Sequence, residues 1–111
     1  MTNNQEWFNN ECPKDIKKIK LQYEDFEGDF VVEDYSDLEK LYLLDLKSIN
    51  KLTLKNLTNL QDCTIRECDL KDLVIEDCPQ IKKLNVRSNL LTSLKFLSSL
   101  TNLEEIGRAH V

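Results

Sequence analysis

Three of the four cysteines lie close together, in the segment CTIRECDLKDLVIEDCPQ that spans residues 63–80. Cys68 and Cys78 are ten residues apart, in the similar settings Arg-Glu-Cys and Glu-Asp-Cys. Paired cysteines serve as zinc ligands, redox pairs or disulfides, and each of these uses requires the sulfur atoms to converge. The chemistry open to Cys63, Cys68 and Cys78 therefore depends on where the fold places them.

The last six residues read IGRAHV and include the only histidine, His110. This string is what a common sequencing adapter encodes, so we interpret residues 106–111 as a suspected sequencing-adapter artefact. On this interpretation the chain is a fragment whose C-terminal end is missing. Such an uncapped end would expose apolar residues, and we expect possible self-association through it.

The remaining residues form no recognisable catalytic set. Without His110 there is no Cys–His or Ser–His pair, and the glycine-rich phosphate-binding patterns and the calcium-loop pattern are absent. Carboxylates are numerous but fall at positions expected to face water: Asp62, Glu67, Asp69, Asp72, Glu76 and Asp77. We therefore expect no enzymatic activity, no cofactor and no metal site.

Composition narrows the class of protein. The formal net charge of −5 argues against a general binder of nucleic acid or of anionic membranes. The start of the chain has no basic, apolar leader, and no long apolar run follows it. Four cysteines in 111 residues are too few for a disulfide scaffold. These features favour a cytoplasmic, intracellular protein.

The elements that position the cysteines follow from an internal repeat. The pattern L-x-x-L-x-L, with Ile, Val or Cys as substitutes, recurs every 21 or 22 residues, at Ile16, Leu38, Leu60, Ile81 and Leu103. A second copy lies inside each repeat, at Ile49, Leu70 and Leu91, and survives in the first repeat as residues 30–32. Such a period is typical of a solenoid in which each turn packs on the next.

The alternation of apolar residues indicates strands. Leu41 and Leu43 are two residues apart, as are the equivalent residues in later repeats, and alternate residues of a strand face the same way. We therefore expect a parallel sheet on each flank and little helix. The alternative is an amphipathic helical bundle, because leucines three apart also suit a helix. The segment LKFLSSLTNLEEI, residues 94–106, retains that helical alternative.

The pattern resembles the leucine-rich repeat family, in its nested variety with two similar halves per repeat. The resemblance covers residues 16–105 and is best in IKKLNVRSNLLTSLKFLSSLTN, residues 81–102, where Asn89 occupies the family's asparagine position. It implies a right-handed leucine-rich-repeat solenoid of the α/β-type superhelix class. It also implies about four turns of parallel β-sheets, truncated at the C-terminal end.

Residues 1–15 do not follow the repeat. An asparagine before Gln-Glu-Trp-Phe is a helix start signal, and Pro13 ends the pattern, so we expect a short helix from Gln5 to Asn10. Trp7 and Phe8 are either binding residues or part of an N-terminal capping segment over the open end of the first repeat. The second interpretation is favoured because the helix directly precedes the repeats.

The repeat register assigns the cysteines to structural positions. Cys63 is equivalent to the core residues Leu41 and Leu84, while Cys68 is equivalent to Asn89. Cys78 takes the corresponding position of the nested half, so it and Cys68 should lie at opposite corners of one coil. We therefore expect buried, unpaired thiols rather than a disulfide or a zinc site.

The outward positions of the first-half strands carry more basic than acidic residues, although the protein is acidic. The resemblance implies that this face is the one that reads a ligand. The expected partner-binding residues are Lys18, Lys20, Tyr23, Lys40, Tyr42, Leu44, Arg66, Lys83 and Arg87. Lysines on exposed strands can also serve only solubility, and the face has too few cations and stacking residues for nucleic acid.

The sequence thus predicts a protein–protein interaction module or scaffold whose partner is another protein with an acidic patch. No nucleic acid, membrane or cofactor is expected. An alternative is the recognition part of a larger signalling, kinase or ubiquitin-ligase protein whose catalytic domain is not in this fragment. A further alternative is a structural spacer that binds no partner through this face.

Overall fold

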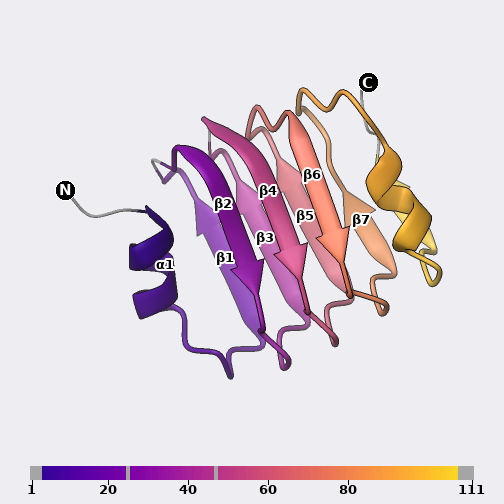
Figure 1. Cartoon of the computed structure of the whole chain (residues 1–111), viewed down its shortest axis with the longest axis horizontal. Coiled ribbons are helices and arrows are strands. Elements are labelled where there is room, and N and C mark those ends of the chain that lie inside the picture. The colour runs from indigo at the N-terminus through magenta and orange to yellow at the C-terminus, as the bar shows by residue number, and fades with distance from the viewer. Residues whose placement is uncertain (1–3, 25, 47, 108–111) are drawn as a thin grey trace.

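The computed structural model describes residues 4–24, 26–46 and 48–107. These residues form a parallel β-solenoid of about four turns with two parallel sheets (Figure 1). The only α-helix among them is α1 (Asn4–Glu11), which lies beside β2 (Gly28–Glu33) at one end of the solenoid. No helix in this part of the chain is long and apolar enough to cross a membrane.

The first-half strands form one sheet, here called sheet A. Its order is β1-β3-β5-β7-β8, and every neighbouring pair is parallel. The strands are β1 (Lys18–Gln22), β3 (Lys40–Leu44), β5 (Asp62–Arg66), β7 (Lys83–Asn85) and β8 (Glu105–Gly107). Equivalent residues of successive repeats stand side by side, because each turn of the solenoid is one repeat long.

The nested half-repeats form the second sheet, sheet B, in the order β2-β4-β6. Its strands are β2, β4 (Ile49–Lys55) and β6 (Asp72–Glu76), all parallel. The predicted pair of flanking parallel sheets is therefore confirmed, and the helical bundle is wrong. Short strands of this kind are stabilised by their neighbours, since successive turns place one strand beside the next in the same sheet.

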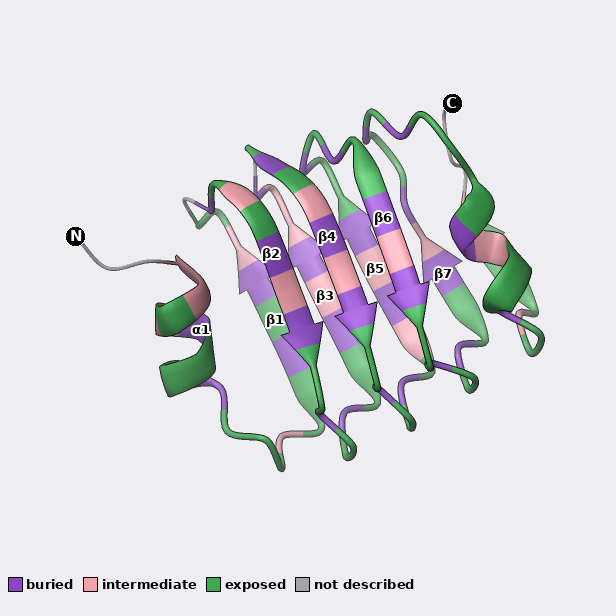
Figure 2. Ribbon diagram, in the orientation of Figure 1, coloured by how far each residue is buried: buried purple, intermediate pink, exposed green. Residues whose placement is uncertain are grey.

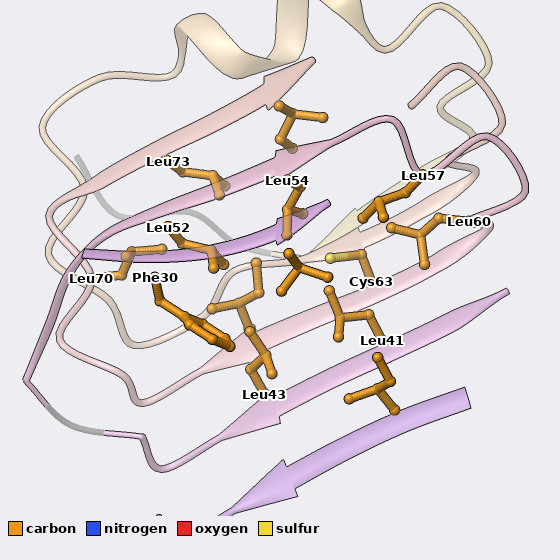
Figure 3. Close-up of a cluster of buried hydrophobic side chains, with 14 of the residues drawn as sticks. Phe30, Leu41, Leu43, Leu52, Leu54, Leu57, Leu60, Cys63, Leu70 and Leu73 are labelled. Carbon is orange, nitrogen blue, oxygen red and sulfur yellow. The ribbon is translucent and has the colours of Figure 1, made fainter. Parts of the chain in front are cut away.

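The core lies between the two sheets. Buried residues alternate with more exposed ones along strands of both sheets, as the colours in Figure 2 show. In β3, for example, Leu41 and Leu43 are buried while their neighbours are partly or fully exposed. Figure 3 shows Leu41, Leu43 and Cys63 from sheet A facing Leu52 and Leu54 from sheet B. All five side chains are buried, so the leucines and the cysteine at repeat positions form one continuous apolar core.

The chain turns after most strands at a residue with positive φ. In sheet A there is one such residue per repeat: Tyr23 (φ 59°), Asp45 (55°), Glu67 (55°) and Ser88 (57°). Asp34, Asn56 and Asp77 do the same after the strands of sheet B. Asp and Asn tolerate this left-handed conformation better than Tyr, Glu and Ser do. The backbone conformation of the turns therefore repeats with the same period as the sequence.

Helix α1 covers the outer edge of β2. Phe8 is fully buried, and its ring lies 4.9 Å from that of Phe30 and 5.7 Å from that of Tyr35. The Gln5 side chain donates a hydrogen bond to the Val31 carbonyl (2.8 Å) and accepts one from the Val31 N–H (2.7 Å). The predicted helix is confirmed, and its contacts are those of a cover over the strand edge rather than of an exposed binding helix.

The fourth nested half-repeat, LTSLKF, does not form the strand that its pattern predicts. In its place the chain makes a 3₁₀-helix, η1 (Lys95–Ser99), beside β6. The helical alternative for residues 94–106 is correct only for this short stretch, since Glu105–Gly107 form β8. Ile106 and Gly107 of the suspected adapter tail thus belong to sheet A, whereas Arg108–Val111, with His110, lie outside the described residues.

Candidate functional site

The nine residues predicted to bind a partner, called the basic face from here on, come from the strands of sheet A and the turns that follow them. Seven lie within strands: Lys18 and Lys20 in β1, Lys40, Tyr42 and Leu44 in β3, Arg66 in β5 and Lys83 in β7. Tyr23 and Arg87 lie in the turns after β1 and β7. All nine are exposed or partly exposed.

Three rows of registered residues cross the face. One row aligns Lys18 with Lys40, Asp62, Lys83 and Glu105; the next aligns Lys20 with Tyr42, Thr64 and Asn85; the third aligns Gln22 with Leu44 and Arg66. Neighbouring strands of a sheet are about 4.8 Å apart. Side chains from three to five neighbouring strands therefore project together toward the same solvent region.

A hollow of about 340 Å³ opens at the N-terminal part of this face. Lys18, Lys20 and Arg66 line it together with Tyr42 and Leu44; Thr64 and Asn85 complete its lining. The Lys18 ammonium lies 5.6 Å from the centre of the Tyr42 ring, within the range of a cation–π contact. The hollow thus combines three cations with an aromatic and an aliphatic surface.

The C-terminal part of the face differs in charge. A second hollow, of about 420 Å³, adjoins the first and is lined by Lys83, Arg87 and Glu105 among others. The Lys83 ammonium lies 3.8 Å from a Glu105 carboxylate oxygen, and both side chains are more than half exposed. Such an exposed pair contributes little to stability, but it reduces the positive potential around Lys83. The cations best placed for an anionic partner are therefore those near Tyr42.

Tyr23 and Lys40 belong to the basic face but lie outside both hollows. Tyr23 is 75% exposed, lies in the turn after β1 and lines neither hollow. Lys40 shares the row of Lys18 but also lies outside both linings. Conversely, Thr64 and Asn85 line both hollows, although charge and aromaticity did not mark them in the sequence.

The cysteines occupy the positions that the repeat register predicts. All four are buried free thiols, and the Sγ atoms of Cys68 and Cys78 donate to carbonyls one turn back, those of Leu43 and Leu54. These contacts follow β5 and β6 respectively, so the two thiols lie at the ends of different sheets. Among the described residues, no group of three or more His, Cys, Asp or Glu side chains could hold a metal ion.

Burial also makes these thiols poor nucleophiles. It raises the pKa of Cys68 to about 11; a hydrogen bond with the Leu46 backbone opposes this rise in part, and nearby carboxylates add a smaller upward contribution. Burial likewise raises the pKa values of Cys12, Cys63 and Cys78. A nucleophilic cysteine needs a lowered pKa and access to solvent, and these residues have neither.

We expect the folded protein to react slowly with a thiol-specific disulfide reagent at pH 8. With a pKa of about 11 instead of 9.0, the thiolate fraction of Cys68 falls by about a hundredfold. The labelling rate at this residue should rise as the pH passes from 9 toward 11. Mass spectrometry of the labelled protein measures this, with urea-unfolded protein as the control. Rapid labelling of the folded protein at pH 8 would contradict buried thiols.

Sheet B carries a charge pattern that the sequence reasoning missed. Its outward residues are Asp-x-Val-x-Glu in β2, Lys-x-Thr-x-Lys in β4 and Asp-x-Val-x-Glu in β6, and they stand in register. The signal was present in the nested half-repeats, residues 29–33, 51–55 and 72–76. Only the observed register makes neighbours of these residues.

Comparison with family models, curated proteins and solved structures found no match to this chain. The candidate site therefore rests on the geometry alone. A rigid sheet face with cations around a tyrosine and a leucine can bind a complementary surface.

Proposed function

We propose that this chain is a protein-interaction module that binds an acidic patch of another protein on its basic face. The observation that carries the proposal is the hollow of about 340 Å³ in which Lys18, Lys20 and Arg66 surround Tyr42 and Leu44. The proposed role is binding without a reaction. The alternative of a recognition part within a larger enzyme has no support among the described residues and stays a prediction.

The residue types in this hollow suit protein recognition. Tyrosine and arginine are enriched among the residues that dominate binding energies, because they bury large area and still form polar contacts. The three cations would attract carboxylates of the partner and orient its approach, and the apolar surface of Tyr42 and Leu44 would be covered on binding. Since these side chains project from paired strands, little backbone ordering is needed on association.

We also propose that the solenoid is a right-handed one of the nested leucine-rich repeat type. The support comes from Asn89, which occupies the asparagine position of that pattern. Its Oδ1 accepts from the N–H groups of Cys68 and Leu70, and its Nδ2 donates to the Ile65 carbonyl one turn back. These hydrogen bonds join one coil to the preceding one, which explains why the motif has an asparagine at this position.

The test reverses the charge of three cations of the basic face, as Lys20→Glu, Lys40→Glu and Arg66→Glu in one variant. We expect the partners that the wild-type chain retains from a native lysate to fall by about tenfold or more, because attraction becomes repulsion. Quantitative mass spectrometry of the retained proteins measures this. All three side chains are exposed, so the variant should keep its circular dichroism spectrum and unfolding midpoint.

A matched control variant reverses three exposed lysines outside the basic face, Lys17, Lys71 and Lys82, to glutamate. It has the same net charge as the test variant, so loss of binding in both would indicate a general effect of charge. If the test variant retains the same partners as the wild type, the assignment of the binding face is wrong. If no protein is retained by any of the three, the spacer alternative is favoured.

A further inference from the structure

Strand β6 is the last strand of sheet B, and its outer edge is partly unpaired. The Glu76 carbonyl accepts from Asn56 N–H on the β4 side. Because alternate residues of a parallel strand direct their backbone groups to opposite sides, Leu73 and Ile75 direct theirs away from β4. Ser99 Oγ donates to the Ile75 carbonyl. Among the described residues, the N–H and C=O of Leu73 and the N–H of Ile75 have no partner on this edge.

The opposite edge of sheet B, at β2, is covered by a side chain of α1. There the backbone N–H and C=O of Val31 in β2 are both bonded to the side chain of Gln5 in α1. An exposed row of backbone groups is a template for pairing with another strand, and proteins usually cover it. The edge at β2 is covered in this way, whereas the edge at β6, beside which η1 packs, is available at the Leu73 N–H and C=O and at the Ile75 N–H.

A groove of about 460 Å³ lies along the available edge. It is bounded by β6 on one side and by Ser93 and η1 on the other. Leu94 is 37% exposed, whereas the equivalent residues Leu52 and Leu73 are buried. Residues 93–97 therefore lie off the position that a fourth strand of sheet B would occupy, and Figure 1 shows η1 as a coil beside β6 rather than as a continuation of the sheet.

The charges on the outer face specify what kind of strand fits. Asp72 of β6 stands beside Lys51 of β4, and Glu76 stands beside Lys55, with Thr53 opposite Val74 between them. The same alternation joins β4 to β2. Opposite charges on neighbouring strands stabilise pairing, and like charges oppose it. A strand added to β6 should therefore present basic residues to Asp72 and Glu76.

We propose that the outer edge of β6 binds an extended, basic segment of a partner protein by strand addition. The segment carries two basic residues four positions apart, with an uncharged residue midway, as Lys-x-Thr-x-Lys does in β4. Its backbone bonds to the free groups of Leu73 and Ile75, and its basic side chains lie beside Asp72 and Glu76. This site is separate from the basic face, which selects the opposite charge.

The chain's own residues 93–97 are a poorer occupant. In strand form they would place Ser93 beside Asp72, Lys95 beside Val74 and Leu97 beside Glu76. This arrangement matches neither carboxylate with a cation and exposes a leucine on the outer face. A second copy of the chain is also a poorer occupant, because in each copy β4, which has the complementary charges, is already paired on both sides.

The probe is a fluorescent peptide of sequence INKLTLK, the copy of β4, with blocked ends, titrated into the full chain and followed by anisotropy. We expect saturable binding, and binding at least about tenfold weaker for INELTLE, in which both lysines are reversed. A peptide with proline in place of the threonine should also lose at least about tenfold, because proline cannot donate the central backbone hydrogen bond. Equal binding of the three peptides, or no saturable binding of INKLTLK, overturns the proposal.

Variants of the protein locate the site. Asp72→Lys with Glu76→Lys should weaken INKLTLK by at least about tenfold and restore binding of INELTLE. The matched control, Asp29→Lys with Glu33→Lys, changes the same residue types on β2, whose edge is covered, and should leave both affinities unchanged. A loss in the control alone places the peptide elsewhere and overturns the proposal. If the double variant fails to fold, the single variant Glu76→Lys provides the same comparison.

Ultracentrifugation of the chain alone tests the remaining occupant. If the chain forms a dimer that INKLTLK dissociates, a second copy occupies the β6 edge, and the proposal of a basic partner segment is overturned. A monomer that binds the peptide supports it. Neither outcome tests the proposed function of the basic face, because the Asp72, Glu76, Asp29 and Glu33 variants leave its cations unchanged.

Discussion

Replacing Asn89 by alanine is expected to lower the free energy of unfolding by roughly 3–5 kcal/mol, since several buried backbone groups lose their partner. Asn89 is only 5% exposed and lies in the turn after β7. Its Oδ1 accepts from two buried N–H groups, those of Cys68 and Leu70, both at 3.1 Å. Alanine leaves both donors inside the solenoid without a partner.

The amide nitrogen of the same residue adds to the effect. It donates to the carbonyl of Ile65 at 2.6 Å, and to those of Val86 and Arg87 at 3.2 and 3.1 Å. The bond to Ile65 joins the fourth coil to the third, whereas the other two hold the local turn. Equilibrium unfolding in urea, followed by circular dichroism, measures the loss.

Asn59→Ala is the matched control for this prediction. Asn59 Nδ2 also donates to a carbonyl one turn back, that of Ser36, but the bond is exposed to water. We expect it to cost less than about 1 kcal/mol, because water replaces the lost partner. If the two alanine variants are equally stable, the buried hydrogen bonds of Asn89 do not join the coils as described.

Replacing Phe8 by alanine is expected to cost roughly 3–5 kcal/mol, the range for removing a buried phenylalanine. The Phe8 ring is fully buried and packs edge-on against Phe30. It is the one buried residue of helix α1, so its removal also loosens the attachment of the helix. The Val31 backbone would then lose the cover that Gln5 provides. Urea unfolding measures the stability of the variant.

The second readout for Phe8→Ala is association. An uncovered β2 edge is a template for pairing between chains, so we expect the variant to sediment as larger species than the wild type. Tyr23→Ala is the control, because Tyr23 is aromatic but 75% exposed, and its loss should change stability by no more than about 0.5 kcal/mol. A monomeric Phe8→Ala variant with wild-type stability would contradict the covering role of α1.

Much of the fold follows from residue spacing. Leucines at steps of two within a strand and of 21 or 22 between repeats predict which side chains enter the core and which strands pair. The same register predicts that Cys68 takes the place of Asn89 in an earlier coil, and its thiol does donate to the carbonyl one turn back. These predictions hold because equivalent residues of a solenoid have equivalent surroundings.

The failure at LTSLKF has a local cause. Leu97 N–H donates to Leu94, Leu100 N–H to Leu97 and Leu103 N–H to Leu100, so a series of i to i+3 bonds competes with pairing to β6. In the 3₁₀ conformation Leu97 is partly buried against the core. In a strand it would face water beside Glu76. The pattern of apolar residues alone does not predict which of these two conformations is more stable.

The sequence by itself determined the repeat length, the strands of the first three coils, the inward leucines and cysteines, and the helix before the repeats. These features depend on periodicity and on short-range propensity. The tertiary structure alone decided that Gln5 covers Val31, that Lys83 pairs with Glu105, that Tyr42 lies among cations and that the β6 edge is available. Each of these depends on contacts between different coils, or between α1 and the sheet, whose distances are set only when the chain has folded.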